Sequence, residues 1–189
     1  MYVHTMPYGE DKIKNMTYDE WKVKTIKREG WSPSLLSEVF AVLDKGVQLN
    51  IEIKERGLEN QVLTVIPPSL KQNIIISSFE GSVIEKVKAL DADVRTALIV
   101  GQSLFTGNNK TFSYWHDYFP ENRLKKAKAD IVCPHFRIGN KLFVQRMHRK
   151  GYEVYVWTVN HPEKIKKIAK TGADGIFTDN IKTAVEQRK

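Results

Sequence analysis

The sequence predicts an α/β fold built on a parallel sheet. From residue 47 onward, apolar stretches rich in Val and Ile alternate with amphipathic stretches, and each pair is joined by only a few residues. Six strand-then-helix units in a row are typical of parallel sheets made of right-handed connections. The strand segments are apolar along their length, as strands buried on both faces must be. The alternation alone fits both a closed (β/α)₈ barrel and an open sheet.

The composition predicts one globular domain over residues 1–189. The 189 residues are 41% hydrophobic, which is enough for a substantial core. Thirty Lys and Arg against 22 Asp and Glu give a net charge of +8, which allows nucleic acid, phospholipid headgroups or a phosphorylated substrate as partners. Much of that excess lies in two lysine-rich runs, 123–128 and 164–170, whose helical spacing is typical of solvent-facing helix surfaces. We therefore expect no nucleic-acid partner.

Further classes are excluded by what the sequence does not contain. The single cysteine, Cys133, rules out an internal disulfide and a cysteine-rich zinc site. No apolar run reaches the roughly 18–20 residues of a membrane span. The first residues lack the basic start and apolar stretch of a signal peptide, so a cytoplasmic location is expected.

Helices and one strand end are expected before the regular alternation. Residues 2–4 read as the end of a strand, stopped by Pro7. Thr17 followed by Glu20 three residues later has the pattern of a capping box and predicts a helix start. A second helix is expected behind Ser32-Pro33 and to end at Gly46.

The expected units then follow in order. Strands are predicted at 47–54, 73–79, 94–100, 130–134, 152–159 and 174–179. Helices are predicted at 57–66, 80–91, 121–129, 138–150 and 162–170, with a short helix at the end of the chain. Between 101 and 119 the sequence predicts a long, aromatic-rich loop, which is either a substrate lid or pocket wall or a self-packed surface segment.

Glu52 and Lys54 are the candidate site residues that the first of these strands supplies. A spacing of two places both side chains on one face of an extended strand. A carboxylate and an ammonium at the end of an apolar strand are costly to bury unless they pair or bind a ligand. They are therefore either a structural ion pair or a metal-ligating carboxylate beside a phosphate-binding lysine.

Four motifs in succession carry a resemblance to a known family. They are Leu-Asn-Ile-Glu-Ile-Lys at 49–54, Ser-Ser-Phe at 77–79, Val-Trp-Thr-Val-Asn at 156–160 and Gly-Ala-Asp-Gly-Ile-Phe-Thr-Asp at 172–179. In this order, at successive strand ends, they resemble those of the glycerophosphodiester phosphodiesterases, which are metal-dependent (β/α)₈ (TIM) barrels. The resemblance spans residues 16–185 and implies hydrolysis of a glycerophosphodiester to an alcohol and glycerol 3-phosphate.

The resemblance also implies roles for individual residues. Glu52 matches a carboxylate ligand of a divalent cation, Ca²⁺ or Mg²⁺, and Lys54 matches the lysine beside the phosphate. His4 matches an acid/base histidine, although Thr5 stands where the family has Asp. Trp157 is expected in the mouth of the barrel, against the small-molecule substrate. His135 follows a strand end and could also face the site.

Two family motifs, His-Arg-Gly and Glu-x-Asp, do not occur in the sequence. We therefore expect an incomplete, N-terminally truncated barrel that lacks the first strand–helix unit and most of the second strand. One carboxylate does not hold a divalent cation tightly, so the chain is expected to be a weak or inactive catalyst. Unpaired strand edges could also mediate oligomerisation.

Two alternative functions stay open. The same barrel wall could serve a non-catalytic protein that binds phosphate or a lipid headgroup. A basic protein that binds nucleic acid through its helical lysines ranks lower, because the sequence contains no recognised nucleic-acid-binding motif.

Overall fold

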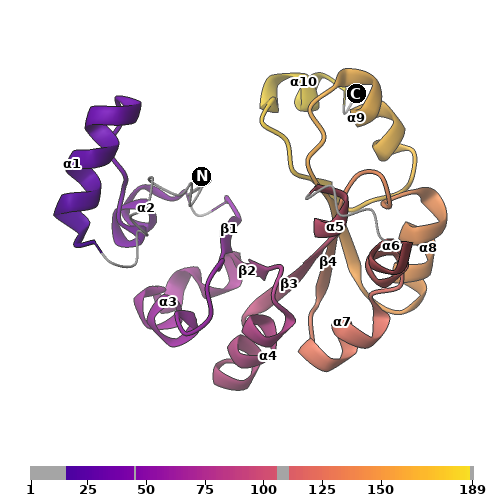
Figure 1. Cartoon of the computed structure of the whole chain (residues 1–189), viewed down its shortest axis with the longest axis horizontal. Helices are drawn as coiled ribbons and strands as arrows, with labels where there is room; N and C mark the ends of the chain where they lie inside the picture. Colours follow the sequence, from indigo (N-terminus) through magenta and orange to yellow (C-terminus); the bar gives the residue numbers. More distant parts are fainter. Residues whose placement is uncertain (1–15, 45, 106–110, 188–189) are drawn as a thin grey trace. The chain divides into compact units, whose positions relative to one another are not determined.

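The computed structural model describes residues 16–44, 46–105 and 111–187 (Figure 1). Contacts within the chain divide it into two compact units, residues 1–43 and 44–189, and each is described on its own. The strand end expected at residues 2–4, and with it His4, lies outside the described residues. The prediction of one domain over 1–189 therefore stays a prediction.

The first unit contains two helices, α1 (Tyr18–Glu29) and α2 (Leu36–Val42). The hydroxyl of Thr17 accepts the backbone N–H of Glu20 at 3.3 Å, and the Glu20 carboxylate accepts the backbone N–H of Thr17 at 2.8 Å. This reciprocal pair is the capping box that the sequence predicts. The second helix is shorter than expected at both ends, because Leu35 before it and Leu43 after it are extended.

The second unit is built on one sheet of six parallel strands. The strands are β1 (Leu49–Glu52), β2 (Ile74–Ser78), β3 (Arg95–Val100), β4 (Ile131–Pro134), β5 (Glu153–Val156) and β6 (Gly175–Ile176). Each strand pairs with the next one in the chain, in the order β1-β2-β3-β4-β5-β6. Doubly wound sheets reverse their strand order at a switch point, whereas a (β/α)₈ barrel does not. The strand order therefore resolves the ambiguity left by the sequence, and the sheet is six strands of a barrel wall.

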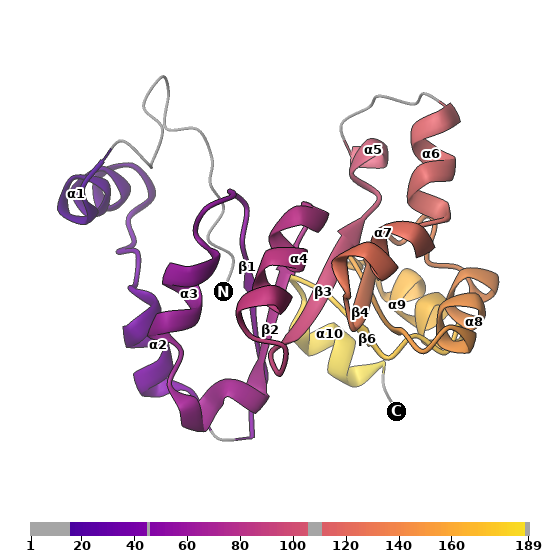
Figure 2. The same ribbon diagram turned by 90° about the horizontal axis from the view of Figure 1, so that it is seen from below.

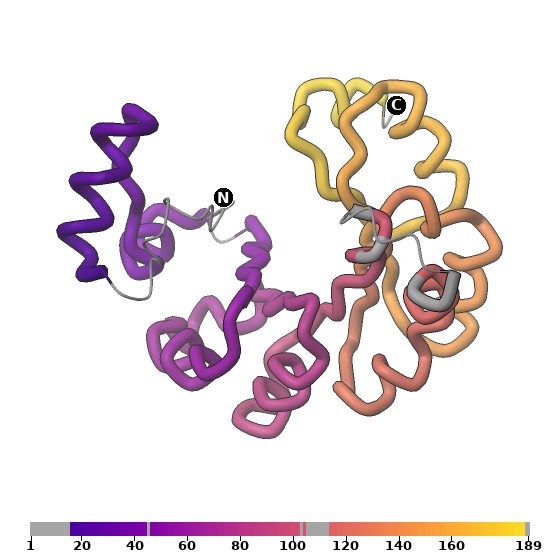
Figure 3. Tube along the Cα trace, viewed as in Figure 1, coloured from indigo at the N-terminus to yellow at the C-terminus, as the bar shows by residue number. Residues whose placement is uncertain are grey.

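Helices connect the strands in the predicted alternation, which can be followed along the trace in Figure 3. They are α3 (Glu59–Val65), α4 (Gly81–Leu90), α7 (Glu121–Ala127), α8 (Lys141–Arg149), α9 (Pro162–Ala169) and α10 (Ile181–Glu186). A 3₁₀ segment, η2 (Pro68–Asn73), follows α3, because Pro67-Pro68 cannot continue an α-helix. The last predicted strand, 174–179, is reduced to two residues.

The segment 101–119, predicted as a loop, contains two helices. They are α5 (Gln102–Phe105) and α6 (Thr111–Tyr118), which follow the carboxyl end of β3 (Figure 2). In α6, Tyr114 stacks on Tyr118 with ring centroids 5.9 Å apart, and Trp115 stacks on Phe119 at 5.7 Å. Aromatic residues spaced by four meet on one helix face. The loop prediction was wrong because the four-residue spacing of these aromatic residues was not recognised as a helical pattern.

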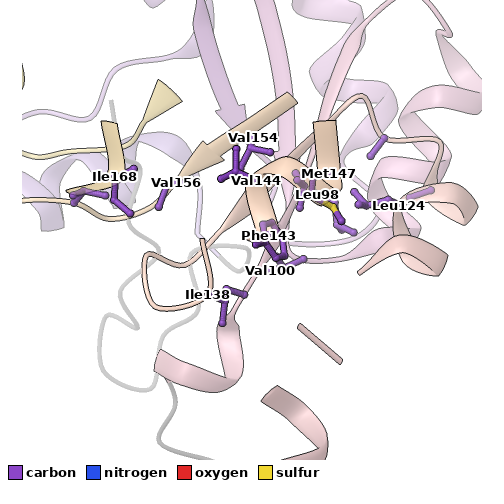
Figure 4. Close-up of a cluster of buried hydrophobic side chains, with 14 of the residues drawn as sticks. Leu98, Val100, Leu124, Ile138, Phe143, Val144, Met147, Val154, Val156 and Ile168 are labelled. Carbon is purple, nitrogen blue, oxygen red and sulfur yellow. The ribbon is translucent and has the colours of Figure 1, made fainter. Parts of the chain in front are cut away.

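The outer face of the sheet carries the larger core. Leu98 and Val100 of β3 and Val154 and Val156 of β5 pack against buried residues of the helices (Figure 4). The helix residues in this cluster include Leu124, Phe143, Val144, Met147 and Ile168. Burial of such side chains contributes roughly 1.5–3 kcal/mol each, so this layer fixes the positions of the strands.

The inner face of the sheet carries a smaller cluster from alternate positions of the strands. Its buried members are Ile75, Ala97, Ile99, Ile131 and Cys133, and Phe79, Tyr155, Trp157 and Phe177 pack against them. At the amino-terminal end of this face, Arg95 bonds Glu153 at 2.5 Å, and the Tyr155 hydroxyl donates to the same carboxylate at 3.0 Å. These contacts form a polar layer at that end of the inner face.

In the described part of the chain, β1 pairs only with β2 and β6 only with β5. Each therefore presents one edge without a ladder partner there, and oligomerisation through such edges stays a prediction. Among the described residues, no helix combines the length and the apolar character that crossing a bilayer requires.

Candidate active site

Glu52 and Lys54 lie side by side at the carboxyl end of β1. Glu52 is in register with Ser77, and the Ile53 N–H donates to the Ser77 carbonyl at 2.8 Å, which extends the ladder toward Lys54. The Lys54 Nζ is 3.7 Å from Glu52 Oε1, and the two side chains are 27% and 17% exposed. The predicted juxtaposition of these two groups is confirmed, and their roles stay a prediction.

The Glu52 carboxylate has unused capacity for a ligand. Its 3.7 Å separation from Lys54 is longer than the roughly 2.7–2.9 Å of a close charge-assisted hydrogen bond. Among the described residues, no hydrogen bond to this carboxylate is present. An ionised carboxylate offers about four acceptor positions, so this group can accept further hydrogen bonds or bind a cation.

Ser77 and Ser78 have different environments, although they are adjacent. The Ser78 hydroxyl donates to the Ile53 carbonyl at 2.7 Å, and it also accepts the Glu80 N–H at 3.1 Å. Ser77 is fully buried beside Glu52, and its hydroxyl has no hydrogen-bond partner within the described residues. Ser78 therefore joins β1 to β2, while Ser77 leaves a polar atom on the inner face.

Trp157 lies on the inner face at the carboxyl ends of the strands, and its expected role toward a substrate stays a prediction. Its indole N–H is shared between the carbonyls of Cys133 (2.8 Å) and Val100 (3.2 Å), which ties the ring to the ends of β3 and β4. The edge-on contact with Phe79, at 5.4 Å between ring centroids, reaches the end of β2. One aromatic ring thus spans the inner face above the core.

His135 lies beside Trp157, directly after the end of β4. It continues the inner-face series that Cys133 belongs to, it is only 7% exposed, and its ring meets that of Trp157 edge-on at 5.0 Å. Its backbone N–H donates to the Val100 carbonyl at 3.0 Å. Gly101 lies directly behind it, and a Cβ at that position would stand 2.5 Å from the His135 Cβ. The sequence indicated His135 only as a residue after a strand end.

Burial, together with the positive charges of Arg137 and Lys164, lowers the pKa of His135 from 6.5 to about 4. The unfolded chain therefore binds a proton at this position at higher pH than the folded chain does.

We expect an acid-sensitive component of stability that depends on His135. Its contribution is fully present above pH 6.5 and decreases as the pH falls toward 4, by about 2–3 kcal/mol in total. Urea unfolding at a series of pH values measures this loss, and His135→Phe should remove it. An equal loss in the wild type and in His135→Phe would contradict the prediction.

Cys133 is a core residue and not a nucleophile. It is fully buried, and burial together with the Glu52 charge raises the pKa of its thiol far above the usual range. Asn50 of β1 and Cys133 of β4 line the same cavity, so the two strands face the same interior.

A cavity of about 270 Å³ lies on the inner face below the rim. Its lining includes Asn50, Cys133, Tyr155 and Phe177, but neither Glu52 nor Trp157. The buried Asn50 Oδ1 has no hydrogen-bond partner within residues that the structure describes. The cavity therefore belongs to the inner face of the sheet. The predicted site residues Glu52 and Trp157 lie outside its lining.

The other described histidines do not join this site. His148 lies on α8 and contacts Asp174 at 2.8 Å, and Asp174 also accepts the Val154 N–H at 2.8 Å. His116 and His161 have no contact with the inner-face residues named above in the described contacts. His4 lies outside the described residues.

Comparison with known proteins decides the family. Residues 2–183 match the model of the glycerophosphoryl diester phosphodiesterase family. The chain belongs to this family. The family resemblance read from the sequence is thereby confirmed.

A glycerophosphodiester phosphodiesterase of Caldanaerobacter subterraneus is 27% identical over 190 residues, which cover 94% of this chain and 73% of that protein. Two solved family structures agree in fold. A phosphodiesterase of Oleispira antarctica, in complex with the product sn-glycerol-3-phosphate, superposes with a TM-score of 0.71 at 21% identity and covers 94% and 72% of the two chains. A glycerophosphodiester phosphodiesterase of Parabacteroides distasonis has a TM-score of 0.67 at 17% identity, over 99% and 76%.

The described residues fit the cation of this family only in part. Glu52 supplies an oxygen ligand of the kind that hard divalent cations prefer. However, residues 16–44, 46–105 and 111–187 contain no group of three His, Cys, Asp or Glu side chains that could hold a metal ion. The described donor set is therefore incomplete for a tightly bound cation.

Proposed function

We propose that this chain hydrolyses glycerophosphodiesters to an alcohol and glycerol 3-phosphate at the rim formed by the ends of β1, β2, β4 and β5. The observation that carries this proposal is the partly buried pair of Glu52 and Lys54, at the strand end where (β/α)₈ barrels place their chemistry. Family membership supports the reaction class, and the product bound to the Oleispira relative supports glycerol phosphate as a ligand of such a site.

Three described residues have roles in this proposal. The Lys54 ammonium, partly buried and beside an open rim, would bind a phosphate oxygen as a point charge. The Trp157 ring would form an apolar wall that keeps water away from one side of the substrate. Glu52 would supply one oxygen ligand to Ca²⁺ or Mg²⁺, ions that neutralise phosphoryl charge when bound. His4 would act as an acid/base histidine.

We expect the 189-residue polypeptide to be a weak catalyst. The sequence contains neither His-Arg-Gly nor Glu-x-Asp, and among the described residues no group of three His, Cys, Asp or Glu side chains could hold a metal ion. The loss of one acid/base histidine alone typically costs on the order of 100- to 10,000-fold in rate. Release of glycerol phosphate from glycerophosphocholine, assayed beside the Caldanaerobacter relative with calcium or magnesium, should be at least about 100-fold slower. Comparable rates would contradict this expectation.

The lack of a three-ligand group in the described part of the chain also favours a second candidate function. In this alternative the rim binds phosphate or a lipid headgroup through Lys54 without turning it over. The two are separated by assaying binding and turnover in the same preparation. Binding of glycerol phosphate with no turnover above the uncatalysed rate would favour the second candidate.

A further inference from the structure

His135 is a nearly buried polar side chain at the rim that the roles proposed for Glu52, Lys54 and Trp157 leave unused. It lies on the inner face, two residues after Cys133, where the strand periodicity directs it toward the interior. Of its two ring nitrogens, Nδ1 has a partner, and Nε2 is not among the fully buried side-chain atoms that lack one. The ring can therefore present Nε2 to a ligand.

The orientation of the imidazole is fixed by its neighbours. The ring meets the Phe136 ring at 4.3 Å between centroids and the Trp157 ring at 5.0 Å. Its backbone carbonyl accepts the N–H groups of Ile138 (2.9 Å) and Gly139 (3.0 Å). A side chain that contacts two rings, on a backbone held by hydrogen bonds, is preorganised for a ligand.

The tautomer of this imidazole follows from one further contact. Nδ1 lies 3.3 Å from the backbone nitrogen of Arg137 and accepts its N–H, so a neutral ring carries its hydrogen on Nε2. Among the described residues, no hydrogen bond to Nε2 is present. Because the pKa of His135 lies near 4, the ring is uncharged at neutral pH and donates without bringing a positive charge.

We propose that the Nε2–H of His135 donates a hydrogen bond to a hydroxyl oxygen of the glycerol half of the bound phosphodiester, a proposal that rests on the function proposed above. Lys54, at the end of β1, is the charged group for the phosphate, whereas an uncharged donor suits a neutral oxygen. The Trp157 ring contacts His135 on one side and Phe79 of the β2 end on the other. The same ring therefore offers an apolar surface for the C–H groups of a polyol beside the donor.

The test compares two ligands on the intact chain, with calcium present. Calorimetry measures the affinity for sn-glycerol 3-phosphate, which carries the hydroxyls, and for inorganic phosphate, which does not. His135→Phe keeps an aromatic ring but removes the donor, and His135→Gln keeps an N–H near the Nε2 position. We expect His135→Phe to weaken sn-glycerol 3-phosphate about 3- to 10-fold and to leave phosphate unchanged, with His135→Gln intermediate.

A direct readout comes from the wild type labelled with ¹⁵N-histidine. Before ligand is added, the His135 resonances should be those of the Nε2–H tautomer, and sn-glycerol 3-phosphate should shift the Nε2 resonance while phosphate does not. An Nδ1–H tautomer, or equal loss of both ligands in His135→Phe, would overturn the proposal. If Glu52→Gln abolishes turnover while His135→Phe binds both ligands as the wild type does, only the role of His135 is wrong. If the wild type binds neither ligand, the proposed function fails and the His135 proposal fails with it.

Discussion

Replacing Glu52 by Gln is expected to reduce the cation-dependent release of glycerol phosphate by at least about 100-fold. If the wild-type chain is only weakly active, the variant should release glycerol phosphate at the uncatalysed rate. The amide keeps the size of the side chain but removes the negative charge that a hard divalent cation requires. It also removes the partner of Lys54, whose Nζ is 3.7 Å from the carboxylate. The measurement is glycerol phosphate released from glycerophosphocholine, with and without added calcium or magnesium.

Glu85→Gln is the matched control for this variant. Glu85 is an exposed residue of α4, on the helical layer outside the sheet, so the same loss of charge there should leave the rate unchanged. The unfolding transition of both variants shows whether each remains folded. Unchanged turnover in Glu52→Gln would show that Glu52 has no role in the reaction. Its ion pair with Lys54 would then be a structural feature.

The sequence was sufficient for the fold class because the strands are short, apolar and separated by well-marked helices. Pro67-Pro68 ended α3 where expected, and Thr17 with Glu20 formed the predicted capping box. Strand order could not be read in this way, because the same alternation occurs in barrels and in doubly wound sheets. Only the hydrogen-bonded neighbours of each strand distinguish a barrel from a doubly wound sheet. These neighbours are set by packing between segments that are distant in the sequence.

The candidate site was predicted in part. The two-residue periodicity of a strand is a strong local rule, and it correctly placed the side chains of Glu52 and Lys54 together. His135 received less weight, because a histidine after a strand end is as often exposed as buried. Counting in twos from Ile131 and Cys133 would have placed it on the inner face. Its burial and lowered pKa, however, depend on Trp157, Arg137 and Lys164, which no local pattern relates to it.

Gly101→Ala is expected to cost about 2–5 kcal/mol of stability and to displace His135. Two effects add at this position. The backbone of Gly101 has φ +102°, a conformation that a residue with a Cβ adopts only with strain. The new Cβ would also stand 2.5 Å from the His135 Cβ and 3.1 Å from its backbone nitrogen, which itself donates to the Val100 carbonyl. Neither atom can move away without breaking the end of the β3–β4 ladder.

Gly151→Ala separates these two effects. Gly151 also has positive φ, +84°, but no atom lies within 4 Å of a Cβ built there, so only the backbone strain of about 1–2 kcal/mol applies. The difference in unfolding free energy between the two variants, measured in urea, therefore reports the contact with His135. Because the rim is built on that contact, Gly101→Ala should also weaken binding of sn-glycerol 3-phosphate, whereas Gly151→Ala should not. Equal losses of unfolding free energy in the two variants would mean that the ends of β3 and β4 shift with little energetic cost. His135 would then not be held in the fixed orientation that its proposed role requires.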